Sequence, residues 1–145
     1  MKKLESTTKI ENDPNLKFVL GLADKDEIED EDCKTIVHLV LNDPIVARDF
    51  FTFPAALTHH HAYRYGLLLH VVQVIAYALA QYDASKEYHK KMGISRDLTI
   101  LLALLHDLGK LLVDQDIIQK PSTLTPEEFT EIKKHPMAGY QLLKE

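Results

Sequence analysis

The stretch LTILLALLHDLGK, residues 98–110, decides how the rest of the sequence is interpreted. Seven of its first eight residues are apolar, and a histidine and an aspartate follow at once. This run predicts a buried helix, capped at its start by Ser95 and ended near Gly109. Because neighbouring side chains near a helix end can reach one ion, His106 and Asp107 are candidate metal ligands. For this dipeptide alone, a hydrogen bond between neighbours near the surface is the simpler interpretation.

A second apolar stretch, GLLLHVVQVIA at residues 66–76, carries His70. Burying an unpaired polar group costs roughly 1–3 kcal/mol, so this histidine needs a partner. A lone core histidine usually bonds to the backbone, but two apolar helices that each carry a histidine favour a shared ligand. The sequence therefore predicts a metal site made of His70, His106 and Asp107. Ligand atoms lie about 2 Å from the ion, so a separation above about 10 Å between these residues would exclude the site.

The composition is that of one small globular domain. The 145 residues are 46% hydrophobic and 27% charged, which is enough apolar material for a core. The net charge of −5 argues against extended nucleic acid as a partner, since such binding needs clustered lysine and arginine. A single cysteine, Cys33, excludes an intrachain disulfide and is interpreted as a core residue. With no apolar leader at the N-terminus and no apolar stretch of about 20 residues, we expect a cytoplasmic protein with no membrane partner.

The remaining pattern predicts helices and no strands, so the expected fold class is all-α, a helical bundle. The longest helix, over about residues 63–81, is apolar nearly all round and should lie at the centre of the fold. Thr125-Pro126-Glu127-Glu128 predicts a helix start with a capping box. Other helices are expected over residues 15–22, 30–41, 114–120 and from 137 onwards. We divide the chain into an acidic helical N-terminal extension, residues 1–50, and a metal-binding helical domain, residues 51–145.

These residues resemble the HD superfamily of metal-dependent phosphohydrolases, whose pattern is His…His-Asp…Asp on a helical bundle. The region around His70 is similar to HD-type 3′–5′ exoribonucleases and to relaxase-associated HD domains, and its matching residues are PAA at 54–56, HHH at 59–61 and GLLLHVV at 66–72. The downstream half is similar to the HD-GYP branch, which hydrolyses cyclic dinucleotides. The matching residues there are HDLGK at 106–110, IQKP at 118–121, LTPEE at 124–128, IKKHP at 132–136 and Gly139.

The resemblance implies a divalent metal cofactor, namely Mn, Fe, Mg or Zn, with His70, His106 and Asp107 as ligands. It implies that His135 serves a second metal. Lys110 would contact the scissile phosphate or the attacking water, which makes Lys110 and Asp107 the expected catalytic residues.

Two further residues are candidate substrate contacts, each with a simpler alternative. His61 belongs to the triplet at residues 59–61, which is otherwise a surface loop, and could fold back over the site. Arg64 could contact phosphate and is otherwise an ordinary surface arginine.

The sequence departs from the family pattern after His135. The HD-GYP branch continues with paired histidines and a Gly-Tyr-Pro signature, and the superfamily with a final aspartate ligand, whereas this chain ends at Glu145. One explanation is that the chain is part of a longer protein. The bundle would then be incomplete at its C-terminal end and its exposed apolar surface would favour a homodimer. The other is that the metal site lacks one carboxylate, which Asp114 or Asp116 could supply.

The expected function is hydrolysis of a small nucleotide phosphoester, with a cyclic dinucleotide phosphodiester as the leading substrate. The alternative is a non-catalytic HD-type module that senses a nucleotide or binds a partner. In a third interpretation, the helices merely pack and the polar side chains are satisfied locally.

Overall fold

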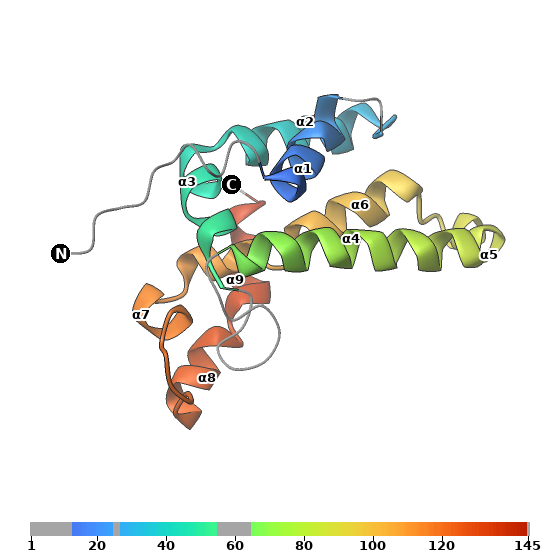
Figure 1. The fold of residues 1–145 in the computed structure, drawn as a ribbon. Helices are drawn as coiled ribbons and strands as arrows, with labels where there is room; N and C mark the ends of the chain where they lie inside the picture. Colours follow the sequence, from blue (N-terminus) through green and yellow to red (C-terminus); the bar gives the residue numbers. More distant parts are fainter. Residues whose placement is uncertain (1–12, 25–26, 55–64, 145) are drawn as a thin grey trace.

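A computed structural model of the chain describes residues 13–24, 27–54 and 65–144. This part of the chain consists of helices joined by loops, and it contains no strand (Figure 1). The all-α prediction is confirmed.

Two helices position the candidate site. They are α4 (Gly66–Ala84) and α6 (Arg96–Leu105), which pack side by side and are connected through the short helix α5 (Lys86–Lys91) (Figure 1). Ser95 caps α6 as predicted, since its side chain accepts the backbone N–H of Leu98 at 3.0 Å. After α5 the chain runs back along α4, so the C-terminal end of α6 lies beside the first turns of α4.

The N-terminal helices cover one side of this pair. They are α1 (Pro14–Asp24), α2 (Glu31–Asn42), α3 (Pro44–Arg48) and the 3₁₀ helix η2 (Phe50–Thr52). Helix α1 packs on α4, and α2 packs on α6. The predicted division at residue 50 stays a prediction. Buried side chains on both sides of it join one core, whose largest fully buried members are Phe50, Phe51, Ile28, Leu67, Leu68, Ile75, Ile100 and Leu104.

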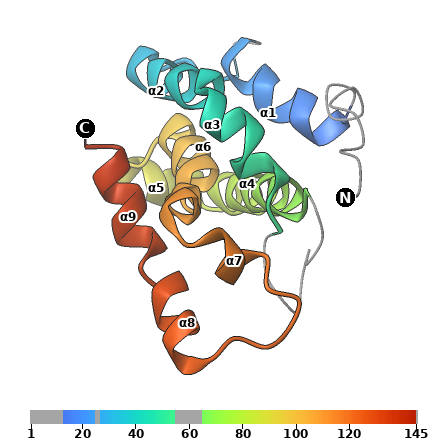
Figure 2. The ribbon, with the colours of Figure 1, turned by 90° about the vertical axis from the view of Figure 1, so that its left-hand side faces the viewer.

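The chain beyond α6 leaves the core and returns to it. The 3₁₀ helix η3 (Leu108–Leu112) is followed by α7 (Gln115–Ile118), α8 (Pro126–Ile132) and α9 (His135–Leu142). Figure 2 shows α8 standing away from the α4–α6 pair, with α9 leading back towards it. The capping box at Thr125 and Glu128 is confirmed. Helix α9 begins at His135 rather than at residue 137, because proline is tolerated in the first turn of a helix.

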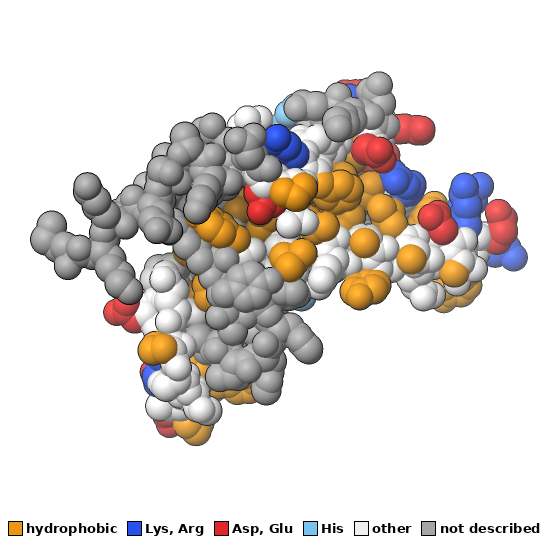
Figure 3. Space-filling model, in the orientation of Figure 1, with side chains coloured by type: hydrophobic (Ala, Val, Ile, Leu, Met, Phe, Trp, Pro, Cys, Tyr) orange, Lys and Arg blue, Asp and Glu red, His pale blue; other side chains and the backbone are white. Residues whose placement is uncertain are grey.

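Helix α4 differs from its prediction. Its buried side chains, including Leu67, Val71 and Ile75, lie on one face only, and Tyr77 is 74% exposed. Figure 3 shows hydrophobic side chains over much of the surface along α4 in that view. The physical reason is that α1, η2 and α6 pack on one side of the helix, whereas apolar composition reports nothing about which faces find a partner.

By length and composition, α4 is the one helix among the described residues that could cross a membrane, and 28% of the window concerned is buried inside the protein. The core helices of soluble proteins pass the same test, so this finding assigns no location.

The prediction that the helix ends near Gly109 is corrected by the structure, in which the α-helix ends four residues earlier. Helix α6 ends at Leu105, and Gly109 lies within η3. Among the described glycines, the left-handed backbone conformation occurs at Gly93, with φ of 71°. Gly109 instead lies where two backbones approach closely.

Candidate metal centre

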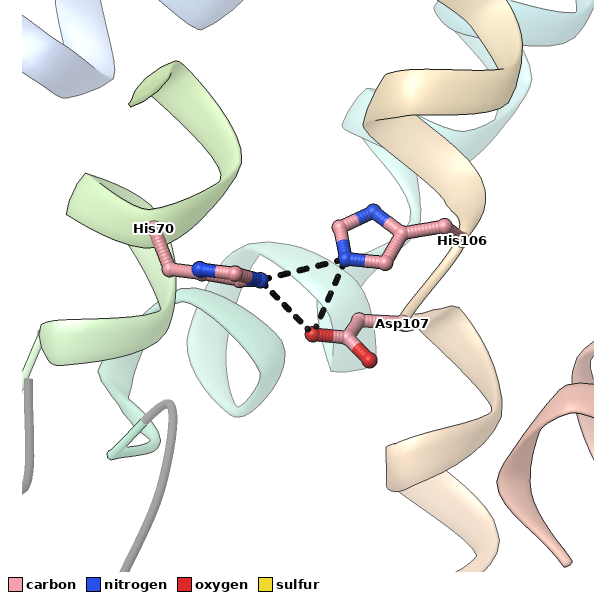
Figure 4. A group of neighbouring side chains, drawn as sticks. All are labelled: His70, His106 and Asp107. Carbon is pink, nitrogen blue, oxygen red and sulfur yellow. Dashed lines mark hydrogen bonds and ion pairs between the residues drawn. The ribbon is translucent and has the colours of Figure 1, made fainter. Parts of the chain in front are cut away.

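The two apolar helices bring His70 and His106-Asp107 together, as predicted. The Nε2 atoms of the two histidines are 3.2 Å apart. Asp107 Oδ2 lies 3.5 Å from His70 Nε2 and 3.2 Å from His106 Nε2. Figure 4 shows the three side chains pointing at a common point, His70 from α4 and the other two from the end of α6. The separation is far below the 10 Å that would have excluded a shared ion.

These distances fit a bound metal ion. Ligands about 2.1 Å from a tetrahedral ion lie about 3.4 Å from one another, which follows from the geometry of the tetrahedron. The three measured ligand–ligand distances, 3.2, 3.2 and 3.5 Å, cluster around that value. The donor set of two imidazoles and one carboxylate suits Zn, Mn and Fe.

Backbone carbonyls orient two of the imidazoles. His106 Nδ1 lies 2.8 Å from the carbonyl oxygen of Ala103, and His135 Nδ1 lies 2.7 Å from that of Ile132. A carbonyl only accepts, so each Nδ1 donates and each Nε2 is left to face the site with its lone pair in the neutral ring. This second contact of a metal-binding histidine fixes its tautomer.

The Asp107 carboxylate contacts every other side chain of the site. It is 4% exposed, and a buried carboxylate must be paired to remain ionised. Lys110 Nζ lies 2.8 Å from Oδ2, and His135 Nε2 lies 3.2 Å from Oδ1. One carboxylate oxygen therefore faces His70 and His106, and the other faces His135.

The pKa values of Asp107 and His106 depend on each other and on the ammonium of Lys110. Burial alone would raise the pKa of Asp107, but the hydrogen bond with His106 and the ammonium of Lys110 outweigh it and hold that pKa well below its ordinary value. The hydrogen bond with Asp107 raises the pKa of His106, against the effect of burial. Both shifts have the same cause, which is that the Asp107 carboxylate stabilises a positive charge beside it.

The structure collects most of the predicted site residues and leaves others elsewhere. Lys110 and His135 both reach Asp107, whereas His61 and Arg64 lie outside the described residues. Asp114 caps α7 by accepting the backbone N–H of Asp116, and neither residue joins the cluster of possible metal ligands among the described residues.

Sequence reasoning missed the groups that hold the imidazoles in place. The carbonyls of Ala103 and Ile132 each come three residues before the histidine they orient. A histidine three residues after a helical residue can donate to that residue's carbonyl oxygen, so this spacing in the sequence predicts the two contacts. The close approach of Gly109 to α9 has no comparable signal in the local sequence.

The chain is similar in sequence to several known proteins. The family model described as "HD domain" matches residues 67–145. A 3′-5′ exoribonuclease YhaM from Listeria welshimeri is 39% identical over 64 residues, which is 44% of this chain and 18% of that protein. A cyclic di-GMP phosphodiesterase response regulator RpfG from Xanthomonas campestris pv. campestris is 35% identical over 57 residues, 37% of this chain and 15% of that protein.

A third relative, a probable cyclic di-GMP phosphodiesterase from Vibrio cholerae serotype O1, is 37% identical over 70 residues. The match covers 48% of this chain and 15% of that protein. The chain thus spans less than a fifth of the length of these relatives. No solved structure matches the chain.

Proposed function

This chain belongs to the HD domain family, and from that premise we propose that it is a metal-dependent phosphohydrolase acting on a nucleotide phosphoester. The observation that carries the proposal is the set of three donor atoms spaced 3.2 to 3.5 Å apart around one point. HD domains bind divalent metals, and this spacing is what a single ion requires.

A cyclic dinucleotide phosphodiester is the leading substrate. Two of the relatives are named as a cyclic di-GMP phosphodiesterase, in one case as a probable one, and the third is named as an exoribonuclease. The first two names denote enzymes of a cyclic dinucleotide and the third an enzyme of RNA, and both substrates are phosphodiesters of nucleotides. The net charge of −5 favours a small substrate over extended nucleic acid, because a bound cation can attract a phosphate locally where the chain as a whole repels a polyanion.

Each residue of the site has a distinct part in the proposed reaction. His70, His106 and Asp107 would hold the cation, and the carbonyl of Ala103 orients the His106 ring towards that point. His135 faces the other oxygen of Asp107, where it is placed to hold a second cation. Lys110 adds positive charge next to the carboxylate, where negative charge on a phosphoryl group would develop. A divalent cation at such a site supplies Lewis-acid charge for the phosphoryl group and activates water near neutral pH.

One observation favours the alternative, a module that binds a nucleotide without hydrolysing it. Among the described residues, the cluster of possible metal ligands contains two histidines and a single carboxylate, Asp107. A second carboxylate would help to balance the charge of two cations, and no other described residue supplies one. The alternative therefore predicts metal binding without turnover.

The test compares metal content with hydrolysis. We expect the purified protein to contain Mn, Fe or Zn by mass spectrometry and to hydrolyse bis-p-nitrophenyl phosphate with added Mn²⁺. Asp107→Asn should abolish both, whereas Asp114→Asn, which changes a cap outside the cluster, should leave both unchanged. Metal without turnover would support the binding module, and the absence of both would overturn the two functions together.

A second assay addresses the substrate. Cyclic di-GMP and a short single-stranded RNA, each incubated with the Mn²⁺-loaded protein and separated by chromatography, should differ in their rate of cleavage. We expect the cyclic dinucleotide to be cleaved faster. Faster release of mononucleotides from the RNA would contradict the substrate proposed here.

A further inference from the structure

His135 reaches the site from a helix that is distant in sequence. It is the first residue of α9, and its Nε2 atom lies 3.2 Å from Asp107 Oδ1. Helix α9 packs on η3, the 3₁₀ helix that directly follows Asp107. The position of the His135 imidazole therefore depends on how closely these two short helices approach one another.

The approach of η3 to α9 is possible only because Gly109 has no side chain. A Cβ atom added to Gly109 would lie 1.8 Å from the carbonyl oxygen of His135 and 2.4 Å from the backbone nitrogen of Gly139. Real Cβ atoms essentially never come within 3.0 Å of such atoms. The atoms in the way belong to the backbone, so they cannot rotate aside as a flexible side chain would. Relief requires η3 and α9 to separate by about 1.2 Å, the difference between 1.8 and 3.0 Å.

A shift of this size is large for the site. Metal–ligand distances tolerate deviations of about 0.2 Å, and a separation of η3 from α9 moves the His135 imidazole away from Asp107, whichever helix shifts. The contact between η3 and α9 leaves more space for a Cβ atom at Gly139 than at Gly109. A Cβ atom on Gly139 would lie 3.1 Å from the Gly109 nitrogen and 3.5 Å from its Cα, which a movement of a few tenths of an ångström would relieve.

We propose that Gly109 is a positioning residue, which sets the His135 imidazole against Asp107 by letting the backbones of η3 and α9 touch. The proposal rests on the metal-dependent function given above, since His135 matters there as a ligand for a second cation. Gly109 makes no contact with substrate or metal in this role. It acts through His135 alone.

The test uses a double-mutant comparison. Mn²⁺ binding to the metal-free protein is measured by calorimetry for the wild type, Gly109→Ala, His135→Ala, the double variant and Gly139→Ala. We expect Gly109→Ala and His135→Ala each to lower the Mn²⁺ affinity of the same binding step about tenfold or more. The Mn²⁺ affinity of the double variant should be no lower than that of His135→Ala. The matched control Gly139→Ala should stay within about threefold of the wild type, because its Cβ atom is nearly accommodated.

Two results would overturn the proposal. One is wild-type Mn²⁺ affinity in folded Gly109→Ala. The other is a double variant in which the loss of Mn²⁺ affinity equals the sum of the losses, in binding free energy, of the two single variants. A purely structural role would lower the unfolding temperature and leave metal affinity intact, so the two readouts separate the roles. If Gly109→Ala loses its helical circular dichroism, Gly139→Val takes its place, since it presses on the same contact from α9. Unchanged Mn²⁺ affinity in that variant would also overturn the proposal.

The structure of Gly109→Ala separates this inference from the proposed function. If the wild type binds no Mn²⁺, the proposed function fails, but the positioning can still be measured. A distance above 4.0 Å between His135 Nε2 and Asp107 Oδ1 in that variant would support the role of Gly109. A distance that stays near 3.2 Å would end it.

Discussion

Asp107 is the residue on which the charges of the site converge. Three imidazoles and one ammonium lie within 3.5 Å of its two oxygens, and it is almost fully buried. The ammonium of Lys110 would lack its buried counter-charge if this carboxylate were neutral. The hydrogen bond with His106 and the Lys110 ammonium lower the pKa of Asp107, so its negative charge is available to a metal ion at neutral pH.

The predicted catalytic role of Lys110 is testable at this scale. Lys110→Met removes the ammonium beside Asp107 and keeps most of the side-chain volume. We expect kcat for bis-p-nitrophenyl phosphate to fall about 100-fold, the usual loss when one charge-stabilising donor is removed. Bound Mn²⁺ should remain at the wild-type stoichiometry. Steady-state kinetics and metal content on the same samples measure the two effects.

The matched control is Lys134→Met, since Lys134 pairs with Glu131 on the surface and its side chain is 62% exposed. It should behave as the wild type. If Lys110→Met instead loses its metal, Lys110 serves to hold Asp107 in position, and the phosphate contact predicted for it is wrong.

At the scale of single elements, helix termini carry much of the local order. Aspartate side chains begin α2, α3 and α7, serine begins α6, and threonine begins α8. Each accepts backbone N–H groups that would otherwise lack a partner. Helix α8 depends most on its cap, because none of its residues is buried.

The cap of α8 predicts a pH dependence. Hydrogen bonds from Lys120 and from the backbone of Thr125 lower the pKa of Glu128 from 4.5. A carboxyl group with a lower pKa in the folded state stabilises the fold above its unfolded pKa, and this contribution is lost as the pH falls through the folded pKa. We therefore expect Glu128→Gln to be less stable than the wild type at pH 7, and the difference to narrow as the pH falls below 4.5.

Urea unfolding followed by circular dichroism at several pH values measures this difference. Glu87→Gln, on the exposed surface of α5, is the matched control, because it also removes one negative charge. A difference between Glu128→Gln and the wild type that is constant from pH 7 to pH 3 would contradict the prediction.

At the scale of the whole molecule, α6 joins the N-terminal helices to the metal centre. At its start, Asp97 is 9% exposed, and its Oδ2 accepts the backbone N–H groups of Glu29 at 2.9 Å and Asp30 at 2.7 Å. At its end are His106 and Asp107. Beside Asp97, the Arg96 guanidinium donates to the carbonyl of Glu27 at 2.8 Å. The first residues of α6 thus bind the N-terminal segment, and the residues at its end form the candidate metal site.

This separation predicts that stability and metal binding can be altered independently. Asp97→Ala leaves two backbone donors without their acceptor, so the free energy of unfolding should fall by about 2–4 kcal/mol. Mn²⁺ affinity of the folded variant should not change, because nine residues of helix place His106 about 14 Å from Asp97. Urea unfolding and calorimetry measure the two quantities. Asp83→Ala, an exposed position on α4, is the control, and a loss of Mn²⁺ affinity in Asp97→Ala would contradict the separation.

The sequence by itself determined the all-α fold and the first three members of the site. Apolar runs and capping residues act over a few positions, so the pattern around Ser95 and Thr125 predicted where helices begin. A histidine in each of two apolar helices predicted the meeting of His70 with His106 and Asp107, because buried polar groups must find partners. The approach of Lys110 to Asp107 follows from their closeness in sequence.

Only the tertiary structure decided the rest. The face of α4 that is covered depends on which helices pack against it, and apolar composition is the same on a covered and an uncovered face. The position of His135 against Asp107 depends on a backbone contact between η3 and α9, where Gly109 meets the His135 carbonyl. That contact joins segments far apart in the chain, and no local pattern specifies it. The resemblance to a family named His135 in advance, whereas the physical cause of its position lies in the packing.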